Sequence, residues 1–150
     1  MLEKKVIEEL NAIVGKENVK VDTAELLTYS YDGTPDQPQV LPDVVVLPGS
    51  QEEIVSIVKL AKREGLHIYT RGAGTNLSGG TIPLRKGIVL VTTRMNKILE
   101  VDVENMTATV EPGVVIRSLI DAVSPHGLLY PPDPGTVNTA TMGGSVSESS

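Results

Sequence analysis

The chain has 150 residues, of which 40% are hydrophobic and 21% charged, a profile typical of one globular domain with a modest core. Its formal net charge of -6 argues against a nucleic-acid partner. Cysteine is absent, which excludes disulfides, thiolate metal sites and a catalytic thiol. Phenylalanine and tryptophan are also absent, so an aliphatic core is expected.

The sequence shows neither a signal peptide nor a transmembrane segment, because no apolar run reaches the length that a membrane span needs. We therefore expect a cytoplasmic protein. Any association with a membrane would then depend on partner subunits.

Residues 1–39 are predicted to form a helical lead followed by an extended connector. Apolar residues recur at helical spacing over residues 2–14. A second short helix is predicted over residues 23–30, with Thr23 as its cap. The side chains of Leu26 and Leu27 are predicted to point inward. Residues 32–42 contain three prolines and Gly33, which favours an extended connector and a domain boundary near residue 39.

The next segment has the pattern of a β-α-β unit. Residues 44–47 are a continuous apolar run, which predicts a strand that is buried on both faces, as in a parallel sheet. Ser50 and Glu53 have capping-box spacing for a helix over residues 51–64. A second strand is predicted at residues 67–70, and the connection should be right-handed. The predicted buried face of the helix comprises Ile54, Val55, Ile57, Val58, Leu60 and Ala61.

The pattern then changes from continuous apolar runs to alternation. Residues 88–91 predict a third buried strand, whereas residues 98–110 alternate around a turn and predict an antiparallel hairpin. A helix is predicted over residues 114–123. The predicted fold class is therefore α+β, with a small parallel β-α-β sheet followed by a mixed or antiparallel β portion.

A glycine-rich stretch runs from Arg71 to Thr81 and holds four glycines among small polar residues. Glycine permits positive φ and a close approach of ligand to backbone, and a row of inward N–H groups can bind an anion. The stretch follows a predicted strand, and ligands of open α/β sheets bind at the carboxyl ends of strands. A flexible surface turn is the alternative interpretation.

Two well-known phosphate motifs do not fit this stretch. Gly80 stands where a P-loop carries its lysine, which argues against a kinase or NTPase. The dinucleotide fingerprint also fails, because Leu77 stands where its third glycine should be, and no amphipathic helix follows directly. The sequence therefore predicts a phosphate cradle of another kind.

A second group of small and polar residues lies at residues 131–148. Prolines stiffen its first part, and the pair Gly143-Gly144 would let the backbone approach a flat or bulky group. A disordered polar tail is the alternative by composition. Four apolar residues argue against a disordered tail, because apolar side chains would be poorly placed in solvent. They are Val137, Ala140, Met142 and Val146.

Taken in order, these stretches resemble the start of an FAD-linked oxidase of the vanillyl-alcohol-oxidase/PCMH type. The similarity is greatest to the group that contains glycolate oxidase and D-lactate dehydrogenase, and it covers residues 25–150. It implies that residues 40–150 are the first part of a PCMH-type FAD-binding domain. The matching stretches are residues 42–48, 71–80, 110–113, 130–134 and 141–146.

In that family the first loop wraps the FAD pyrophosphate, and the second group borders the ribityl chain and the isoalloxazine. Members that bind flavin covalently often carry histidine where Thr75 stands, so the resemblance implies non-covalent FAD. The cofactor-binding residues that it implies are Arg71, Gly72, Ala73, Gly74, Thr75, Asn76, Ser78, Gly79, Asp133, Pro134, Thr136, Gly143, Gly144, Ser147 and Glu148.

The resemblance implies a flavin-dependent oxidoreductase that oxidises a small 2-hydroxy acid such as glycolate or D-lactate. Family members run to several hundred residues, so the rest of the FAD domain and the substrate domain would come from a following segment or a second chain. The chain alone is expected to be inactive. No catalytic or metal-ligating residue is predicted, and His67 and His126 are interpreted as structural.

Other functions remain open at this point. The chain could be a stand-alone nucleotide- or phosphate-binding module, or a truncated remnant without redox activity. UDP-N-acetylmuramate reductase shares the fold type, but the element Pro131-Pro132-Asp133-Pro134 favours the hydroxy-acid group.

Overall fold

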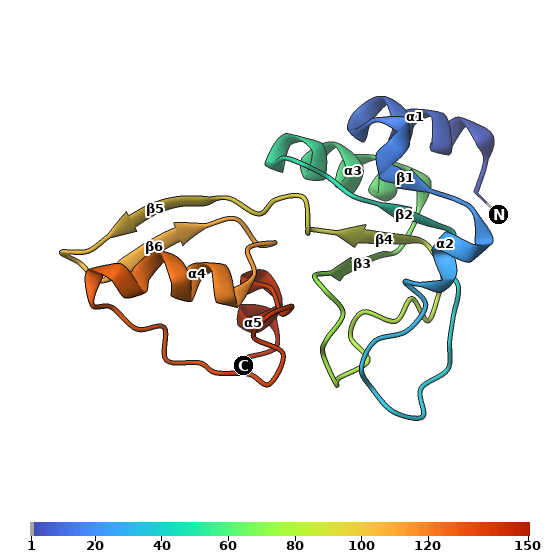
Figure 1. Ribbon diagram of the computed structural model, residues 1–150. Helices are drawn as coiled ribbons and strands as arrows, with labels where there is room; N and C mark the ends of the chain where they lie inside the picture. The colour runs from blue at the N-terminus through green and yellow to red at the C-terminus, as the bar shows by residue number, and fades with distance from the viewer. Residues whose placement is uncertain (1) are drawn as a thin grey trace.

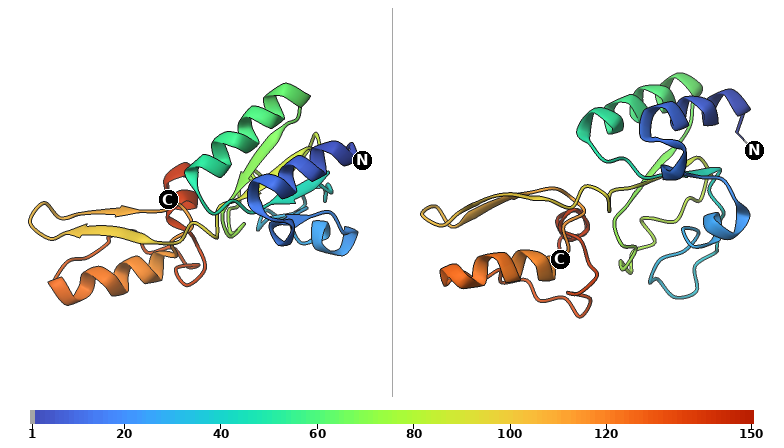
Figure 2. Two further views of the ribbon diagram at one scale, coloured as in Figure 1. Left: turned by 90° about the horizontal axis from the view of Figure 1, so that it is seen from above. Right: turned by 45° about the horizontal axis from the view of Figure 1, so that its top comes forward.

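The computed structural model describes residues 2–150. A four-stranded sheet with helices on it forms one part, and a hairpin with a helix packed beneath it forms the other (Figure 1). The views of Figure 2 show the hairpin extending away from the sheet. The chain crosses from the first part to the second after β4, and its C-terminus returns to the junction of the two parts (Figure 1).

The sheet contains β1 (Val19–Lys20), β2 (Val44–Val46), β3 (Ile68–Arg71) and β4 (Ile88–Val91) in the order β1-β2-β4-β3. Strand β4 pairs in parallel with both β2 and β3, so the predicted parallel sheet is confirmed. All residues of β2 and β4 are buried, as their continuous apolar runs indicated. Strand β1 pairs antiparallel with β2 and was not predicted.

Two helices, α1 (Lys4–Val14) and α3 (Gln51–Glu64), cover one face of this sheet (Figure 1). Helix α3 begins at Ser50, whose hydroxyl accepts the N–H of Glu53 at 3.3 Å, and ends at Gly65 in the left-handed region. The Glu53 carboxylate accepts the N–H of Gly49, one residue before the cap. The core between helices and sheet comprises Val6, Leu10, Val14, Val19, Val44, Val46, Ile57, Leu60, Ala61, Ile88 and Leu90.

The buried stripe of α3 is narrower than predicted. Val55 and Val58 are 43% and 46% exposed, so their assignment to the buried face is wrong. The sheet beneath α3 is narrow and α1 lies beside the helix, so the residues in contact are Ile57, Leu60 and Ala61, with Ile54 partly buried. No helix of residues 2–150 combines the length and the apolar character needed to cross a membrane.

Helix α2 (Thr23–Leu27) is shorter than predicted and covers the other face of the sheet. Its cap is Asp22, whose carboxylate accepts the N–H of Ala24 at 2.9 Å, so the assignment of Thr23 as cap is wrong. Leu26 is buried against β2 and β4, but Leu27 is 48% exposed, so its assignment to the inward face is wrong. Consecutive residues of a helix point in directions about 100° apart, so the two side chains cannot face the sheet together.

The second part contains the hairpin of β5 (Ile98–Asp102) and β6 (Thr107–Val110), which confirms the predicted antiparallel portion. Helix α4 (Ile116–Val123) packs on it, and helix α5 (Met142–Ser147) was not predicted. Two short 3-10 helices lie at Lys16–Asn18 and Ser124–His126. The core of this part comprises Val114, Ile116, Leu119, Val123, Ala140 and Met142, whereas Val146 is 74% exposed, contrary to expectation.

The N-terminal segment shares its sheet and its core with the segment that follows. Strand β1 pairs with β2, and α1 packs against α3 in the same hydrophobic cluster. A division of the chain near residue 39 stays a prediction about its organisation.

Candidate functional site

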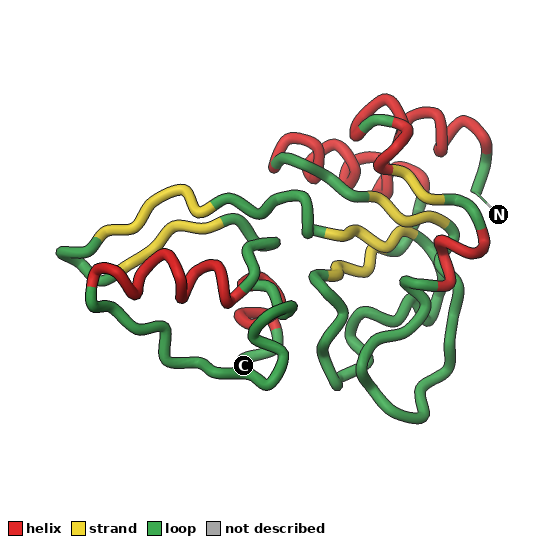
Figure 3. The backbone as a smooth tube through the Cα atoms, in the orientation of Figure 1, coloured by secondary structure: helices red, strands yellow, loops and turns green. Residues whose placement is uncertain are grey.

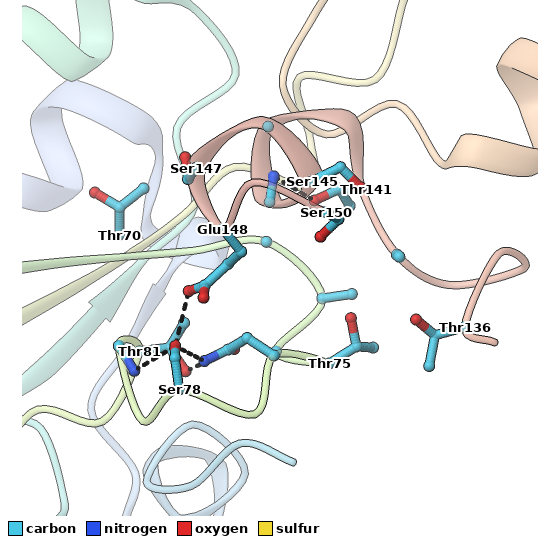
Figure 4. Close-up of a pocket in the computed structure, with 18 of the residues that line it drawn as sticks. Thr70, Thr75, Ser78, Thr81, Thr136, Thr141, Ser145, Ser147, Glu148 and Ser150 are labelled. Atoms are coloured by element: carbon cyan, nitrogen blue, oxygen red, sulfur yellow. Dashed lines mark hydrogen bonds between the residues drawn. The ribbon is translucent and has the colours of Figure 1, made fainter. Parts of the chain in front are cut away.

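A cleft of about 890 Å³ lies at the carboxyl ends of β3 and β4. One wall is the glycine-rich loop at residues 72–81, which follows β3. The opposite wall is formed by residues 134–136 and by α5 with its cap Thr141 (Figure 4). Figure 3 shows that long loops rather than regular elements gather at this end of the sheet. The cleft therefore lies where an open α/β sheet is expected to bind a ligand.

The backbone of the glycine-rich loop offers free donors to this cleft. Within the described residues, the backbone N–H groups from Gly72 to Asn76 donate to no protein acceptor. Gly74 has a φ of 73°, and a Cβ at this position would collide with the Arg71 guanidinium. A Cβ at Gly72 would collide with the Thr141 hydroxyl across the cleft. Glycine is thus required at both positions, and the loop can serve as an anion cradle.

Arg71 lies beneath the loop and is only 7% exposed. Its Nη1 donates to the Tyr31 carbonyl at 2.6 Å and to the Thr81 hydroxyl at 3.3 Å, and its guanidinium lies 5.7 Å from the Tyr29 ring centroid. Burial lowers the pKa of Arg71, and the Asp32 carboxylate opposes that shift. The guanidinium therefore ties β3 to residues 29–31 and does not line the cleft.

The opposite wall of the cleft contains a second pair of glycines, which let α5 lie close to Pro112. Thr141 caps α5 by accepting the N–H of Gly144 at 3.4 Å, and the N–H of Gly143 donates to the Pro112 carbonyl at 2.8 Å. A Cβ at Gly143 would lie 2.7 Å from the Cβ of Pro112, so only glycine allows this approach. Glu148 reaches back across the cleft and accepts the Ser78 hydroxyl at 2.9 Å (Figure 4).

The structure brings twelve of the fifteen predicted cofactor residues onto the walls of this one cleft. They are Gly72, Ala73, Gly74, Thr75, Asn76, Ser78, Pro134, Thr136, Gly143, Gly144, Ser147 and Glu148. Arg71, Gly79 and Asp133 lie outside its lining. The individual contacts of all fifteen residues with FAD stay predictions.

Sequence reasoning missed several residues of the site. Thr81 and Thr141 both line the cleft, and Asp32 binds the side chains of Thr81 and Asn76. Thr141 stands directly before Met142 and is a residue type that commonly caps helices, so it was the signal that could have revealed both the cap and α5. Asp32 carried no such signal, because it is far from the loop in sequence.

The residues present fit a dinucleotide better than a metal ion. Free amides and hydroxyls line the cleft, and its volume exceeds what a single phosphate occupies. Among the described residues no three His, Cys, Asp or Glu side chains are grouped as metal ligands. Both His67 and His126 are exposed and lie outside the cleft. A glycine-rich loop at parallel strand ends, facing a second glycine pair across a cleft, defines a nucleotide-cofactor-binding domain.

The chain belongs to the family described as FAD binding domain, which matches residues 42–150. FAD is therefore its cofactor, and the predicted family and PCMH-type fold are confirmed. The glycolate oxidase subunit GlcD of Bacillus subtilis is 46% identical over 150 residues, which are 100% of this chain and 32% of that protein. A D-lactate dehydrogenase of Archaeoglobus fulgidus is 44% identical over 123 residues, which are 79% of this chain and 27% of that protein.

Solved structures agree with this placement. An alkyldihydroxyacetonephosphate synthase superposes with a TM-score of 0.84 at 28% identity, over 97% of this chain and 31% of that chain. A p-cresol methylhydroxylase superposes with a TM-score of 0.73 at 28% identity, over 83% of this chain and 25% of that chain. The chain thus spans about a third or less of the length of the relatives that it matches.

Proposed function

We propose that the chain is the FAD-binding portion of a flavin-dependent oxidoreductase that oxidises a 2-hydroxy acid such as glycolate or D-lactate. The observation that carries this proposal is the cleft itself, whose glycine-rich wall presents free N–H groups opposite the Gly143-Gly144 wall. The substrate class is supported by the names of two relatives, which are a glycolate oxidase subunit and a D-lactate dehydrogenase.

The glycine-rich loop would hold the pyrophosphate of FAD. The amides from Gly72 to Asn76 would donate charge-assisted hydrogen bonds to its oxygens, aided by the hydroxyls of Thr75 and Ser78. Residues 133–136 would border the ribityl chain, and the small residues of α5 would allow the flavin to approach the backbone. Thr75 offers no group for a flavin bond of the kind that a histidine forms, so FAD is held non-covalently. Bound FAD supplies the electron acceptor for oxidation of the hydroxyl-bearing carbon.

Glu148 has to move when a phosphate enters the cradle. Its carboxylate accepts the Ser78 hydroxyl, and an anion at the loop would repel this negative charge. The side chain is exposed, so a change of rotamer costs little. We expect Glu148 to release the Ser78 hydroxyl, which would then be able to donate to the phosphate.

The remaining parts of the enzyme would come from a following segment or from a second chain. The relative from Bacillus subtilis is named as a subunit, which supports an assembly of several chains. The chain alone is inactive in this proposal, because no residue of it is assigned to the substrate. The complete protein is cytoplasmic, and partner subunits provide any contact with a membrane.

The test uses the complete flavoprotein that contains this chain. Purified protein should be yellow, and acid precipitation should release FAD into the supernatant, as non-covalent binding requires. Anaerobic addition of glycolate or D-lactate should bleach the flavin absorbance. A colourless protein that takes up no FAD would favour a remnant or a phosphate-binding module. Bound flavin that neither hydroxy acid bleaches would overturn the substrate class.

A further inference from the structure

A short segment before the family-matched region packs against the glycine-rich loop from the side away from the cleft. Residues 29–34 follow α2, whereas the family matches residues 42–150. Figure 3 shows this connector and the loop after β3 beside each other at one end of the sheet. The segment is joined to the loop by side-chain and backbone hydrogen bonds from residues about 40 positions away in sequence.

Asp32 lies at the centre of these contacts. Its Oδ2 accepts the side-chain amide of Asn76 at 2.7 Å and the Thr81 hydroxyl at 3.2 Å. Its Oδ1 accepts the backbone N–H of Thr34 at 2.9 Å, which fixes the turn of the segment itself. The Thr81 hydroxyl in turn accepts from Arg71 at 3.3 Å. One carboxylate therefore ties the middle and the C-terminal end of the glycine-rich loop to the segment.

Backbone groups add two further links. The N–H of Gly33 donates to the Asn76 carbonyl at 3.0 Å, and the N–H of Gly79 donates to the Thr34 hydroxyl at 2.8 Å. These bonds use donors outside the stretch from Gly72 to Asn76, so the free amides of the cradle stay available to a ligand.

We propose that residues 29–34 brace the glycine-rich loop for the FAD pyrophosphate, and that Asp32 is the central positioning residue of this brace. The inference rests on the proposed function, because it assigns the loop to the pyrophosphate. It adds a requirement for residues that precede the matched family region. Asp32 does not line the cleft, so it would act on the cofactor through Asn76 and Thr81.

The physical reason is preorganisation. A glycine-rich loop has many accessible conformations, and a ligand that must order it loses affinity. The brace fixes Asn76, Gly79 and Thr81 before the ligand arrives. Loss of the charged anchor should weaken FAD binding about 10- to 100-fold, as expected when hydrogen bonds to a charged group are removed.

Asp32 is ionised throughout the neutral range. Burial raises its pKa, but the hydrogen bonds from Thr34, Asn76 and Thr81 outweigh that effect and lower the pKa below its ordinary value. The charged group that interacts with Asp32 is Arg71, and the titratable groups beside Arg71 are Tyr29 and Tyr31. Because a lowered pKa keeps the carboxylate charged until the pH falls through it, the brace should not respond to pH near neutrality.

The test compares Asp32→Asn with Asp36→Asn in the complete flavoprotein. Asp36 is exposed and four residues further along, so the second variant makes the same chemical change outside the brace. FAD is removed and its dissociation constant is measured by fluorescence quenching. Asp32→Asn should bind FAD about 10- to 100-fold more weakly, equally at all neutral pH values, and Asp36→Asn should match wild type.

Hydrogen exchange in the FAD-free protein separates a brace from general support of the fold. Asp32→Asn should speed exchange at the N–H groups of Gly33 and Gly79, and it should leave the helix α3 protected as in wild type. Faster exchange throughout the sheet and α3 would show a structural role only and would overturn the inference. An FAD affinity like that of Asp36→Asn would overturn it as well.

A second variant covers the case in which Asp32→Asn fails to fold. Thr34→Val keeps the shape of the side chain and removes the acceptor of the Gly79 N–H. It should weaken FAD binding about three- to tenfold, and unchanged affinity would contradict the brace. If wild-type protein binds no FAD at all, the proposed function fails. If wild type binds FAD and both brace variants bind it equally well, only this inference fails.

Discussion

Gly74 has no room for a side chain, because its φ is 73° and the Arg71 guanidinium fills the place of a Cβ. Gly74→Val should therefore abolish FAD retention. A β-branched residue is strained at positive φ, and it would displace Arg71 and turn the neighbouring amides away from the cradle. The measurement is the ratio of flavin to protein after purification of the complete enzyme, with circular dichroism to check the fold.

Gly127 provides a matched control for this change. Its φ is 72°, nothing lies within 4 Å of a Cβ built on it, and it ends the 3-10 helix Ser124–His126 outside the cleft. Gly127→Val should carry the same backbone strain and keep its flavin. Full flavin content in Gly74→Val would show that the loop is not the pyrophosphate site.

The Thr75 hydroxyl should contribute less than the backbone of the loop. Thr75 lines the cleft, and Thr75→Ala removes one donor while the amides of the cradle remain. We expect FAD affinity to fall about tenfold, the effect of one hydrogen bond to a charged group. Thr75→Ser keeps the hydroxyl and should stay close to wild type. Equal affinities for the two variants would remove Thr75 from the binding site.

At the scale of elements, α5 depends on its close approach to Pro112. Gly143→Ala would place a Cβ 2.7 Å from the Cβ of Pro112 and 3.0 Å from its carbonyl oxygen, so α5 would shift outward. We expect a loss of about 1–3 kcal/mol in the free energy of unfolding, as for overpacked sites, together with weaker FAD binding. Urea denaturation monitored by circular dichroism measures the first effect.

Gly135→Ala is the control for α5. Gly135 lies on the same side of the cleft, its backbone is not in the positive-φ region, and nothing lies within 4 Å of a Cβ there. Its stability should stay within about 0.5 kcal/mol of wild type. An equally stable Gly143→Ala protein would mean that α5 does not need this contact.

The sequence predicted the elements whose patterns are long and strong. Continuous apolar runs identified β2 and β4, and alternation identified the hairpin. Strand β1 was not predicted, because it has only two residues and is defined by its pairing with β2 rather than by a pattern in its own sequence. Helix α5 escaped because adjacent glycines are poor helix formers, and the packing of Gly143 on Pro112 overrides that propensity.

The candidate site was predicted where its residues lie close together in sequence and was missed where they lie far apart. Glycines and prolines at fixed places revealed both walls, because each wall is local in sequence. The contacts between Asp32 and the glycine-rich loop could not be predicted, since they join residues 44 and 49 positions apart. The predicted buried faces of two helices were too wide, because they included Val55 and Leu27, which are exposed. The spacing of apolar residues along a helix indicates in which direction each side chain points, but it does not indicate how wide a surface covers the helix.

At the scale of the whole molecule, residues 1–150 alone should bind FAD weakly or not at all. The chain spans about a third of its relatives, and the parts that follow in those proteins would complete the contacts to the cofactor. Titration of the isolated chain with FAD, monitored by flavin fluorescence, should give a dissociation constant far above that of the complete enzyme. Nanomolar binding by the isolated chain would contradict this expectation.

The strand order β1-β2-β4-β3 also determines when the strands can pair while the chain is being synthesised. The central strand β4 is the last of the four to be made, and both β2 and β3 pair with it and not with each other. A ribosome that adds about 5–20 residues per second leaves the apolar run Val44–Val46 without its parallel neighbour for several seconds. We therefore expect the nascent chain to be most prone to aggregation before Val91 has emerged, because an unpaired apolar strand exposes hydrophobic surface.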